Sequence, residues 1–413
     1  MAQQRLPVTS EPSQLDPATV ANPYPRYQQL REEDPVHWNA GINCWILTRY
    51  TDVLAAFRDQ RLSSAQISAF SGRLSEDAAE KIQPLTQIFS DMMLMSDPPD
   101  HTRLRKLANK AFTPRVVERM RSSMQATTDE LLDGIEKDGR QDGRFDVIQD
   151  LANPLPAIVI SEMLGVPAAD REQFKIWSSA LAAFLGNIRM VAETAESALN
   201  SVLALSDYLR EIISQRRLEP QEDLLSAFVA AEEEGDKFSE AELYSMCILL
   251  MIAGHETTTN LIGNGLLALL QNRDQLERLQ ADPGMIETAI EEFLLYDSPI
   301  QSAARIAMED MELGGQSIDK GQRVAMIVGA ANRDPERFSD PDRLDITRED
   351  NRHLSFGFGS HFCLGSALAR VEGQITINAV VQRWRPGLRL NGDEIEWRYN
   401  PSFRSLISLP VAF

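Results

Sequence analysis

The alternation of apolar and polar positions predicts a mainly α-helical chain with a minor β portion. Between about residues 100 and 382, most segments repeat their apolar residues at helical spacing. Residues 1–20 are polar and contain prolines, which predicts a flexible N-terminal tail before a single domain at 21–413. Short β-type runs are expected at 35–38, 44–48, 305–318, 323–328 and 395–413.

The longest predicted helix covers 238–272. Ser239 and Glu242 have the spacing of a capping box, and no proline follows before Pro283. The apolar part of this helix, 246–253, is too short to cross a bilayer, and polar residues follow it directly. We therefore expect a core helix that carries polar residues in mid-course.

The segment 62–95 shows no clear period. It mixes Ser, Gly and Asp with bulky apolar residues such as Phe70 and Phe89. Long irregular segments in compact proteins are often lids over a site. A lid and a pair of helices both remain open for this segment.

Net charge, the N-terminal residues and the cysteine count argue against several classes of function. The chain has 61 acidic and 41 basic residues, and the net charge of −20 opposes binding to nucleic acid or to an anionic membrane. The first residues contain no apolar leader, so we expect a cytoplasmic protein without a membrane anchor. The three cysteines, Cys44, Cys247 and Cys363, are too few and too widely spaced for a disulfide framework or a four-thiolate zinc site.

The most informative segment is 356–365, with the sequence Phe-Gly-Phe-Gly-Ser-His-Phe-Cys-Leu-Gly. Its glycines let the backbone approach a large flat group near Cys363. The residues that follow have helical character, so the sulfur precedes a helix N-terminus, where amide groups stabilise a thiolate. Cys363 is therefore a candidate metal ligand, and a buried free cysteine beside a glycine-rich turn is the structural alternative.

Two other motifs are incomplete. His255 and Glu256 open like a zinc-protease motif, but Thr259 stands where the second histidine is required. The segment 357–362 opens like a dinucleotide-binding fingerprint, but Phe362 stands in place of the third glycine. Metal-dependent hydrolysis and dinucleotide binding are therefore not supported.

The segment 356–365 matches the pattern Phe-x-x-Gly-x-His-x-Cys-x-Gly, and with it the chain resembles the cytochrome P450 family of haem-thiolate monooxygenases. The resemblance covers nearly the whole chain and implies a single large, mainly α haem-thiolate fold. It makes Cys363 the axial ligand of haem b, with Phe356 shielding the sulfur and Gly357 and Gly365 beside the cofactor.

A second match is Ala-Gly-His-Glu-Thr-Thr at 253–258, in the middle of the long helix. A threonine hydroxyl that competes for a helical carbonyl loosens the helix locally. The resemblance places Ala253 and Gly254 at the cofactor and makes Thr257 the hydroxyl at the oxygen site, with Glu256 as its acidic partner in proton delivery. The alternative is a run of threonines that fills a polar gap between helices.

A third match concerns carboxylate binding. His101 and Arg105 lie four residues apart, on one face of a predicted helix. By the resemblance they hold a haem propionate, together with Arg305 and His361. The same region, 103–121, carries seven basic residues: Arg103, Arg105, Lys106, Lys110, Arg115, Arg119 and Arg121. This stretch is a candidate landing site for an acidic ferredoxin or flavodoxin that works with its own reductase, and an ordinary solvated face is the alternative.

The fourth match is incomplete. The family carries Glu-x-x-Arg on a helix, but here Leu295 follows Glu292 where the arginine is expected. We predict that Glu292 pairs with Arg343 instead. We predict that an arginine introduced at 295 restores a missing cation and raises the melting temperature. The alternative is that it overpacks a site that has adapted to leucine, with Arg343 or Arg337 serving Glu292 unaided.

The resemblance implies insertion of one atom of dioxygen into a C–H bond of an apolar or amphipathic molecule of polyketide, terpenoid, steroid or fatty acyl type. Electrons would come from separate proteins. A peroxide-driven haem enzyme and a noncatalytic haem-binding or ligand-binding protein are the alternatives. The substrate contacts expected by family position are Phe70, Met93, Leu94, Leu249, Leu250, Ile300 and Phe403.

Overall fold

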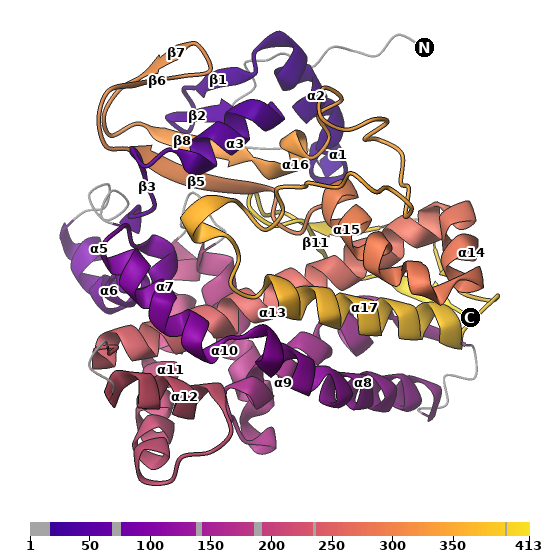
Figure 1. The fold of residues 1–413 in the computed structure, drawn as a ribbon, viewed down its shortest axis with the longest axis horizontal. Helices are drawn as coiled ribbons and strands as arrows, with labels where there is room; N and C mark the ends of the chain where they lie inside the picture. The colour runs from indigo at the N-terminus through magenta and orange to yellow at the C-terminus, as the bar shows by residue number, and fades with distance from the viewer. Residues whose placement is uncertain (1–16, 68–75, 138–142, 186–191, 234–236, 393–394) are drawn as a thin grey trace.

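The structure, a computed structural model, describes residues 17–67, 76–137, 143–185, 192–233, 237–392 and 395–413. Most of the body is helical, and a β-rich part lies at one end of it (Figure 1). The expected fold class, mainly α with a minor β portion, is confirmed.

The main sheet joins the N-terminal strands to strands from the last third of the chain. Its order is β1-β2-β8-β5-β3. β1 (Val36–Asn39) and β2 (Cys44–Leu47) form an antiparallel hairpin at the predicted position. β8 (Arg323–Ile327) runs parallel to β2, and β5 (Ser302–Ala307) runs antiparallel to β8. β3 (Leu62–Ser63) pairs with β5 at the edge of the sheet.

The long helix α13 (Glu240–Gln271) begins with the predicted capping box. Ser239 Oγ accepts a hydrogen bond from the amide of Glu242 at 3.2 Å, and the Glu242 carboxylate accepts one from the amide of Ser239 at 2.7 Å. These two bonds satisfy amide groups that a helix start otherwise leaves without a partner. The capping pair therefore sets where the helix begins.

Helix α13 is the centre of the helical body (Figure 1). It contacts α9 (Pro154–Met163), α10 (Arg171–Leu185), α15 (Ile286–Tyr296) and α17 (Ser366–Arg383). Other helices surround it, and its residues are buried on all faces along most of its length, which is the pattern of a core helix rather than of an amphipathic surface helix.

The remaining elements are shorter or lie outside this centre. The other helices are α1 (Pro17–Ala21), α2 (Tyr24–Glu33), α3 (Tyr50–Arg58), α5 (Glu76–Lys81), α6 (Gln83–Ser90), α7 (Asp100–Ala111), α8 (Pro114–Lys137), α11 (Ala192–Leu218), α12 (Leu224–Glu233), α14 (Arg273–Ala281) and α16 (Val328–Ala331). Short 3-10 or π turns lie at Met93–Met95, Ile148–Ala152, Ala168–Asp170, Pro283–Met285 and Gly359–His361. A three-stranded sheet has the order β4 (Arg144–Asp146), β12 (Pro410–Ala412), β9 (Arg389–Leu390). Two further sheets are two-stranded: β6 (Met311–Leu313) pairs with β7 (Gln316–Ile318), and β10 (Trp397–Arg398) pairs with β11 (Ser405–Leu406).

Two expectations about irregular segments change. Residues 17–20 were expected in the flexible tail, but they belong to helix α1, and the carbonyl of Val20 accepts a hydrogen bond from Arg404 at 2.7 Å. Of the two possibilities for 62–95, the described part contains the helix pair α5 and α6. Among the described residues, none of the helices combines the length and apolar content that a membrane crossing needs.

Candidate active site

The loop that contains Cys363 is held by its own backbone. The amide of Cys363 donates to the carbonyl of Phe356 at 2.9 Å, and the amide of Phe362 donates to the carbonyl of Gly359 at 3.1 Å. Gly357 and Gly359 have φ values of 69° and 76°, a region that side chains with a Cβ rarely adopt. The loop is therefore a tight turn whose shape depends on the glycines of the motif.

The sulfur of Cys363 lies just before helix α17, as predicted. In the protein alone, burial raises the pKa of the Cys363 thiol, while the amide of Gly365 and the cations Arg105 and Arg370 act in the opposite direction. A bound iron ion carries a larger local charge than these groups and deprotonates a coordinating thiol. The amide and the two cations fit a ligand that must be a thiolate.

Arg370 also packs against the aromatic ring of Phe356, the first residue of the cysteine motif. Its guanidinium lies 4.5 Å from the ring centroid of Phe356 and pairs with Glu291 at 2.6 Å. His353 Nε2 lies 3.3 Å from the same carboxylate. Burial raises the pKa of Glu291, but hydrogen bonds from Arg370 and His353 outweigh it and lower the pKa to about 2. Sequence reasoning missed Arg370, because its partner lies 79 positions away.

The four groups predicted to bind carboxylates come together. The rings of His101 and His361 stack with their centroids 3.9 Å apart, and His361 Nε2 lies 3.0 Å from Ser64 Oγ. Burial, followed by Arg305, His101 and Arg105, lowers the pKa of His361 to about 3. The cluster thus gathers hydrogen-bond donors and positive charge and disfavours any further cation.

His101 provides the test of whether a cofactor fits this cluster. Its side chain is buried, and neither ring nitrogen has a hydrogen-bond partner among the described residues. A buried polar group without a partner costs stability, so this imidazole suits a site that a ligand completes. Donors and positive charge around an unpaired imidazole fit the carboxylate groups of haem.

The predicted oxygen site is the one stretch in the middle of α13, between its two exposed ends, that reaches accessible space. Between Ser245 and Leu269, every residue is buried except Ala253, Gly254, Glu256 and Thr257. The Thr257 hydroxyl donates to the carbonyl of Ala253 at 2.7 Å, which is the competition for a helical carbonyl expected from the sequence. These residues open a notch in a helix that is otherwise closed by its neighbours.

Gly254 has a packing role in the structure. The resemblance places it at the cofactor, which stays a prediction, and a Cβ at this position would lie 3.2 Å from the side chain of Ile160 in α9. The glycine therefore allows α9 to approach α13 closely.

His255 anchors the same stretch on its buried side. Its Nε2 lies 2.7 Å from Asn153 Oδ1, and its Nδ1 lies 3.3 Å from Ser178 Oγ. Burial lowers the pKa of His255 to about 4, so the ring is neutral near pH 7. This histidine, set aside above as an incomplete zinc motif, connects α13 to the start of α9 and to α10.

Helices α13 and α17 run in the same direction where they touch. A Cβ at Gly373 would lie 3.2 Å from the Leu261 side chain, and a Cβ at Gly265 would lie 2.9 Å from that of Ile377. If the two helices keep this pairing toward their N-termini, residues 253–257 of α13, two turns earlier, lie beside the first turn of α17. The notch in α13 and the Cys363 loop therefore belong to one site.

The predicted substrate contacts are partly assembled. Met93 lies in a short helical turn that contacts α13, and Leu249 and Leu250 are buried in α13 one to two turns before the notch. Ile300 and Phe403 face each other in an isolated antiparallel β-bridge. Leu94, in the same turn as Met93, is partly buried against the core. Phe70 lies outside the described residues.

The predicted pair of Glu292 with Arg343 does not form. The Glu292 carboxylate is fully buried and accepts hydrogen bonds from Arg348 Nε at 2.8 Å, from the amide of Asp345 at 2.9 Å and from Asn351 Nδ2 at 3.2 Å. Burial raises the pKa of Glu292 despite these partners. The Arg343 side chain is exposed, and its carbonyl instead accepts a hydrogen bond from Arg348.

Leu295, at the position of the missing arginine, is 1% exposed in an apolar cluster. Its neighbours in that cluster include Leu47, Phe338 and Leu354. The local packing has therefore adapted to leucine, and Arg348 has taken over the ion pair with Glu292.

Comparison with known proteins agrees with this geometry. The family model named Cytochrome P450 matches residues 64–283 and 284–400. The chain belongs to the cytochrome P450 family. Polyketide biosynthesis cytochrome P450 PksS of Bacillus subtilis (strain 168) is 43% identical over 408 residues, which cover 95% of this chain and 96% of that protein. Cytochrome P450 monooxygenase PikC of Streptomyces venezuelae is 40% identical over 401 residues, 95% and 91% of the two chains.

Solved structures of P450 proteins superpose closely. P450BioI, solved in complex with hexadec-9Z-enoic acid ligated acyl carrier protein, has a TM-score of 0.88 and 40% identity, and covers 96% of this chain and 99% of that chain. This P450 is a monooxygenase with haem b as its cofactor, and it receives electrons from separate proteins. When bound, haem supplies dioxygen activation and transfer of one oxygen atom to a C–H bond.

Proposed function

We propose that this P450 hydroxylates a long, mainly apolar molecule of the polyketide or fatty acyl type. The predicted contacts that the structure describes are aliphatic, aromatic or thioether side chains, which bind through apolar area. PksS is named for polyketide biosynthesis, and the P450BioI structure contains a fatty acyl chain on a carrier protein. The observation that carries the proposal is the notch at 253–257 beside the Cys363 loop.

Each polar residue has a distinct role in this proposal. Cys363 is the iron ligand, and its loop excludes water from the sulfur. His101, Arg105, Arg305 and His361 hold the carboxylates of the cofactor. Glu256 supplies protons, and the Thr257 hydroxyl passes them toward the oxygen site. Residues 21–413 act as one catalytic domain, which is supported by the main sheet, where N-terminal strand β2 pairs with β8 from the last third of the chain.

The proposed electron donor is an acidic ferredoxin or flavodoxin, served by its own reductase in the cytoplasm. Two side chains of the basic stretch 103–121 connect it to distant parts of the chain: Arg103 binds Glu242, and Arg105 donates to the carbonyl of Phe362 at 2.7 Å. The second contact connects α7 directly to the cysteine loop. Phe358 and Phe362 of that loop are 37% and 40% exposed.

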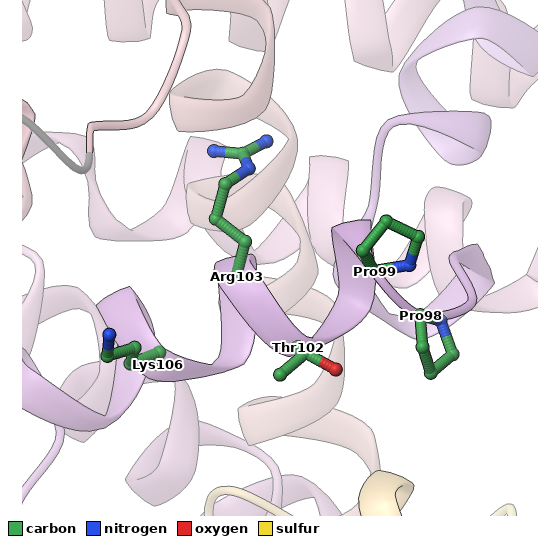
Figure 2. A pocket seen from close by; sticks show the side chains of 5 residues that line it. All are labelled: Pro98, Pro99, Thr102, Arg103 and Lys106. Atoms are coloured by element: carbon green, nitrogen blue, oxygen red, sulfur yellow. The ribbon is translucent and has the colours of Figure 1, made fainter.

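The start of α7 shows how these basic side chains are presented. Figure 2 shows Arg103 pointing to one side of the helix, and Thr102 and Lys106 to the other. With Pro98 and Pro99 they line an open hollow of about 590 Å³. Exposed basic groups next to apolar rings suit a transient complex with an acidic partner.

Reconstitution tests the reaction and its alternatives. Substrates are first chosen by the change in haem spin state that they cause. With NADPH, ferredoxin and ferredoxin reductase, we expect a hydroxylated product whose oxygen comes from ¹⁸O₂. Efficient turnover with hydrogen peroxide alone would favour a peroxide-driven enzyme, and spin shifts without any product would favour a noncatalytic binding protein.

Charge reversal tests the docking surface. Arg115→Glu and Arg119→Glu should raise the KM for ferredoxin several-fold at low salt, and the effect should shrink as ionic strength rises. Arg389→Glu, an exposed change on β9, is the control. Equal KM values for all three variants would place the docking site elsewhere.

A further inference from the structure

The carboxylate of Glu256 is held by the C-terminal hairpin formed by β10 and β11. Arg398 Nη1 donates to Oε1 of Glu256 at 3.2 Å, and Ser405 Oγ donates to the same oxygen at 3.3 Å. The Glu256 side chain is only 13% exposed. Two donors from one hairpin therefore fix one oxygen of the proposed proton donor.

The two donors stand on the same rung of the hairpin. Arg398 of β10 lies directly opposite Ser405 of β11, and β11 packs against α13. The next rung pairs Trp397 with Leu406. Because directly opposite residues of a β-ladder are close neighbours, the hairpin presents both donors together.

A buried ion pair holds the hairpin in place. The Arg404 guanidinium lies 3.3 Å from the Trp397 ring centroid and donates to Asp297 Oδ1 at 3.1 Å. The amide of Arg404 donates to the carbonyl of Pro299, next to the Ile300–Phe403 bridge. The hairpin thus reaches both the proton donor and the predicted substrate contacts.

The two donors differ in their access to water. Ser405 is 2% exposed, whereas the Arg398 side chain is 53% exposed. No described residue donates to the second oxygen, Oε2 of Glu256. The carboxylate is therefore held by one oxygen, through a half-exposed cation and a buried hydroxyl, and the other oxygen has no donor among the described residues.

We infer that Arg398 and Ser405 are positioning residues for proton delivery. They hold Oε1 of Glu256, so that Oε2 gives up its proton toward the Thr257 hydroxyl and regains one from solvent. Neither residue touches the reacting atoms, and both act through Glu256. This inference rests on the proposed function of Glu256 and adds the groups that orient it.

The variants separate charge, hydrogen bonding and fold. Arg398→Ala and Ser405→Ala each remove one donor, and the double variant removes both. Arg398→Lys keeps a cation, and Ser405→Thr keeps the hydroxyl. Arg389→Ala is the matched control, because Arg389 is an exposed arginine of another C-terminal strand and donates to the carbonyl of Gly387 instead.

Coupling is the first measurement, taken as product formed per NADPH consumed at matched haem content. Each single alanine variant should lower coupling about threefold, because one partly exposed or long hydrogen bond to a carboxylate contributes an effect of about this size. The double variant should lower coupling about tenfold. Hydrogen peroxide release should rise in step, and substrate Kd should stay unchanged. Arg398→Lys and Ser405→Thr should restore most of the loss.

The C–O stretching band of the reduced carbon monoxide complex is the second measurement and needs no turnover. Arg398→Ala and Ser405→Ala should shift and broaden this band, because the carboxylate then takes several positions near the oxygen site. Glu256→Gln gives the reference for an altered carboxylate, and Arg389→Ala should match the wild type. Unchanged coupling and an unchanged band in the double variant would overturn the inference.

The two measurements distinguish this inference from the proposed function. A wild-type protein that forms no product would contradict the proposed function, while the band would still report whether the hairpin positions Glu256. A band that shifts in the hairpin variants but not in Glu256→Gln would show that these residues act on something other than the carboxylate.

Discussion

The Cys363 loop and the notch in α13, the two halves of the proposed active site, are held in different ways. The loop is shaped by hydrogen bonds between residues fewer than ten positions apart and by two glycines with positive φ. The notch depends on distant partners: Asn153 and Ser178 on one side of the helix, and Arg398 and Ser405 on the other. A local turn thus fixes Cys363, the proposed iron ligand, and the packing of four chain segments fixes His255 and Glu256 at the proposed proton path.

The largest loss of activity is expected from replacing Cys363 in the loop. Cys363→His should abolish the red-shifted Soret band of the reduced carbon monoxide complex and all monooxygenase activity, because the thiolate ligand is lost. Cys247→Ala is the control, since burial raises the pKa of the Cys247 thiol to about 12 and keeps it neutral. A wild-type spectrum in Cys363→His would remove the assignment of the ligand.

The second prediction tests the scaffold behind the loop. Leu295→Arg should lower the free energy of unfolding by about 3 kcal/mol, because it places a charge in an apolar cluster where Arg348 already serves Glu292. Leu295→Met, which keeps the volume, should cost less than about 1.5 kcal/mol. Urea unfolding at matched haem occupancy measures both. A more stable Arg variant would show that Glu292 still lacks a cation.

The third prediction concerns the partners of the notch. Burial holds the pKa of His255 at about 4, below its ordinary value, so the unfolded chain takes up a proton first as the pH falls. The stability contributed by neutral His255 is present above pH 6.5 and is lost as the pH falls toward 4. Between pH 7 and pH 5 the loss should be about 2 kcal/mol.

His255→Gln, which keeps a polar group but cannot titrate, isolates this contribution. Urea unfolding of both proteins between pH 7 and pH 5 gives the difference in slope. Parallel pH profiles would show that the ring becomes protonated without cost in the folded protein.

The smallest effect is expected at the notch itself. Thr257→Ala should reduce product per NADPH about tenfold, less than the roughly 100-fold or more that a general acid–base group contributes to a rate, with a matching rise in hydrogen peroxide. Substrate affinity should be kept. Thr257→Ser, which retains the hydroxyl, should recover coupling, and failure of Ser to do so would make the methyl group rather than the proton path responsible.

The ion pair predicted for Glu292 was wrong, and it shows what a sequence pattern cannot determine. Glu292 was expected to pair with Arg343, but Arg348 takes that position. Both arginines lie in an irregular stretch without helical or strand periodicity, so their spacing does not indicate which one turns inward. Arg348 is selected because its guanidinium also donates to the carbonyls of Ser339 and Asp340, which orient it toward the carboxylate.

The sequence by itself determined the features that depend on near neighbours. The capping box of α13, the hydroxyl–carbonyl contact of Thr257 and the turn around Cys363 all join residues a few positions apart, so their spacing encodes their geometry. Tertiary structure alone decided the partners of His255, Glu256 and Glu292. Those partners lie 53 to 149 positions away, and contacts at that range depend on how whole helices and hairpins pack, which no local pattern records.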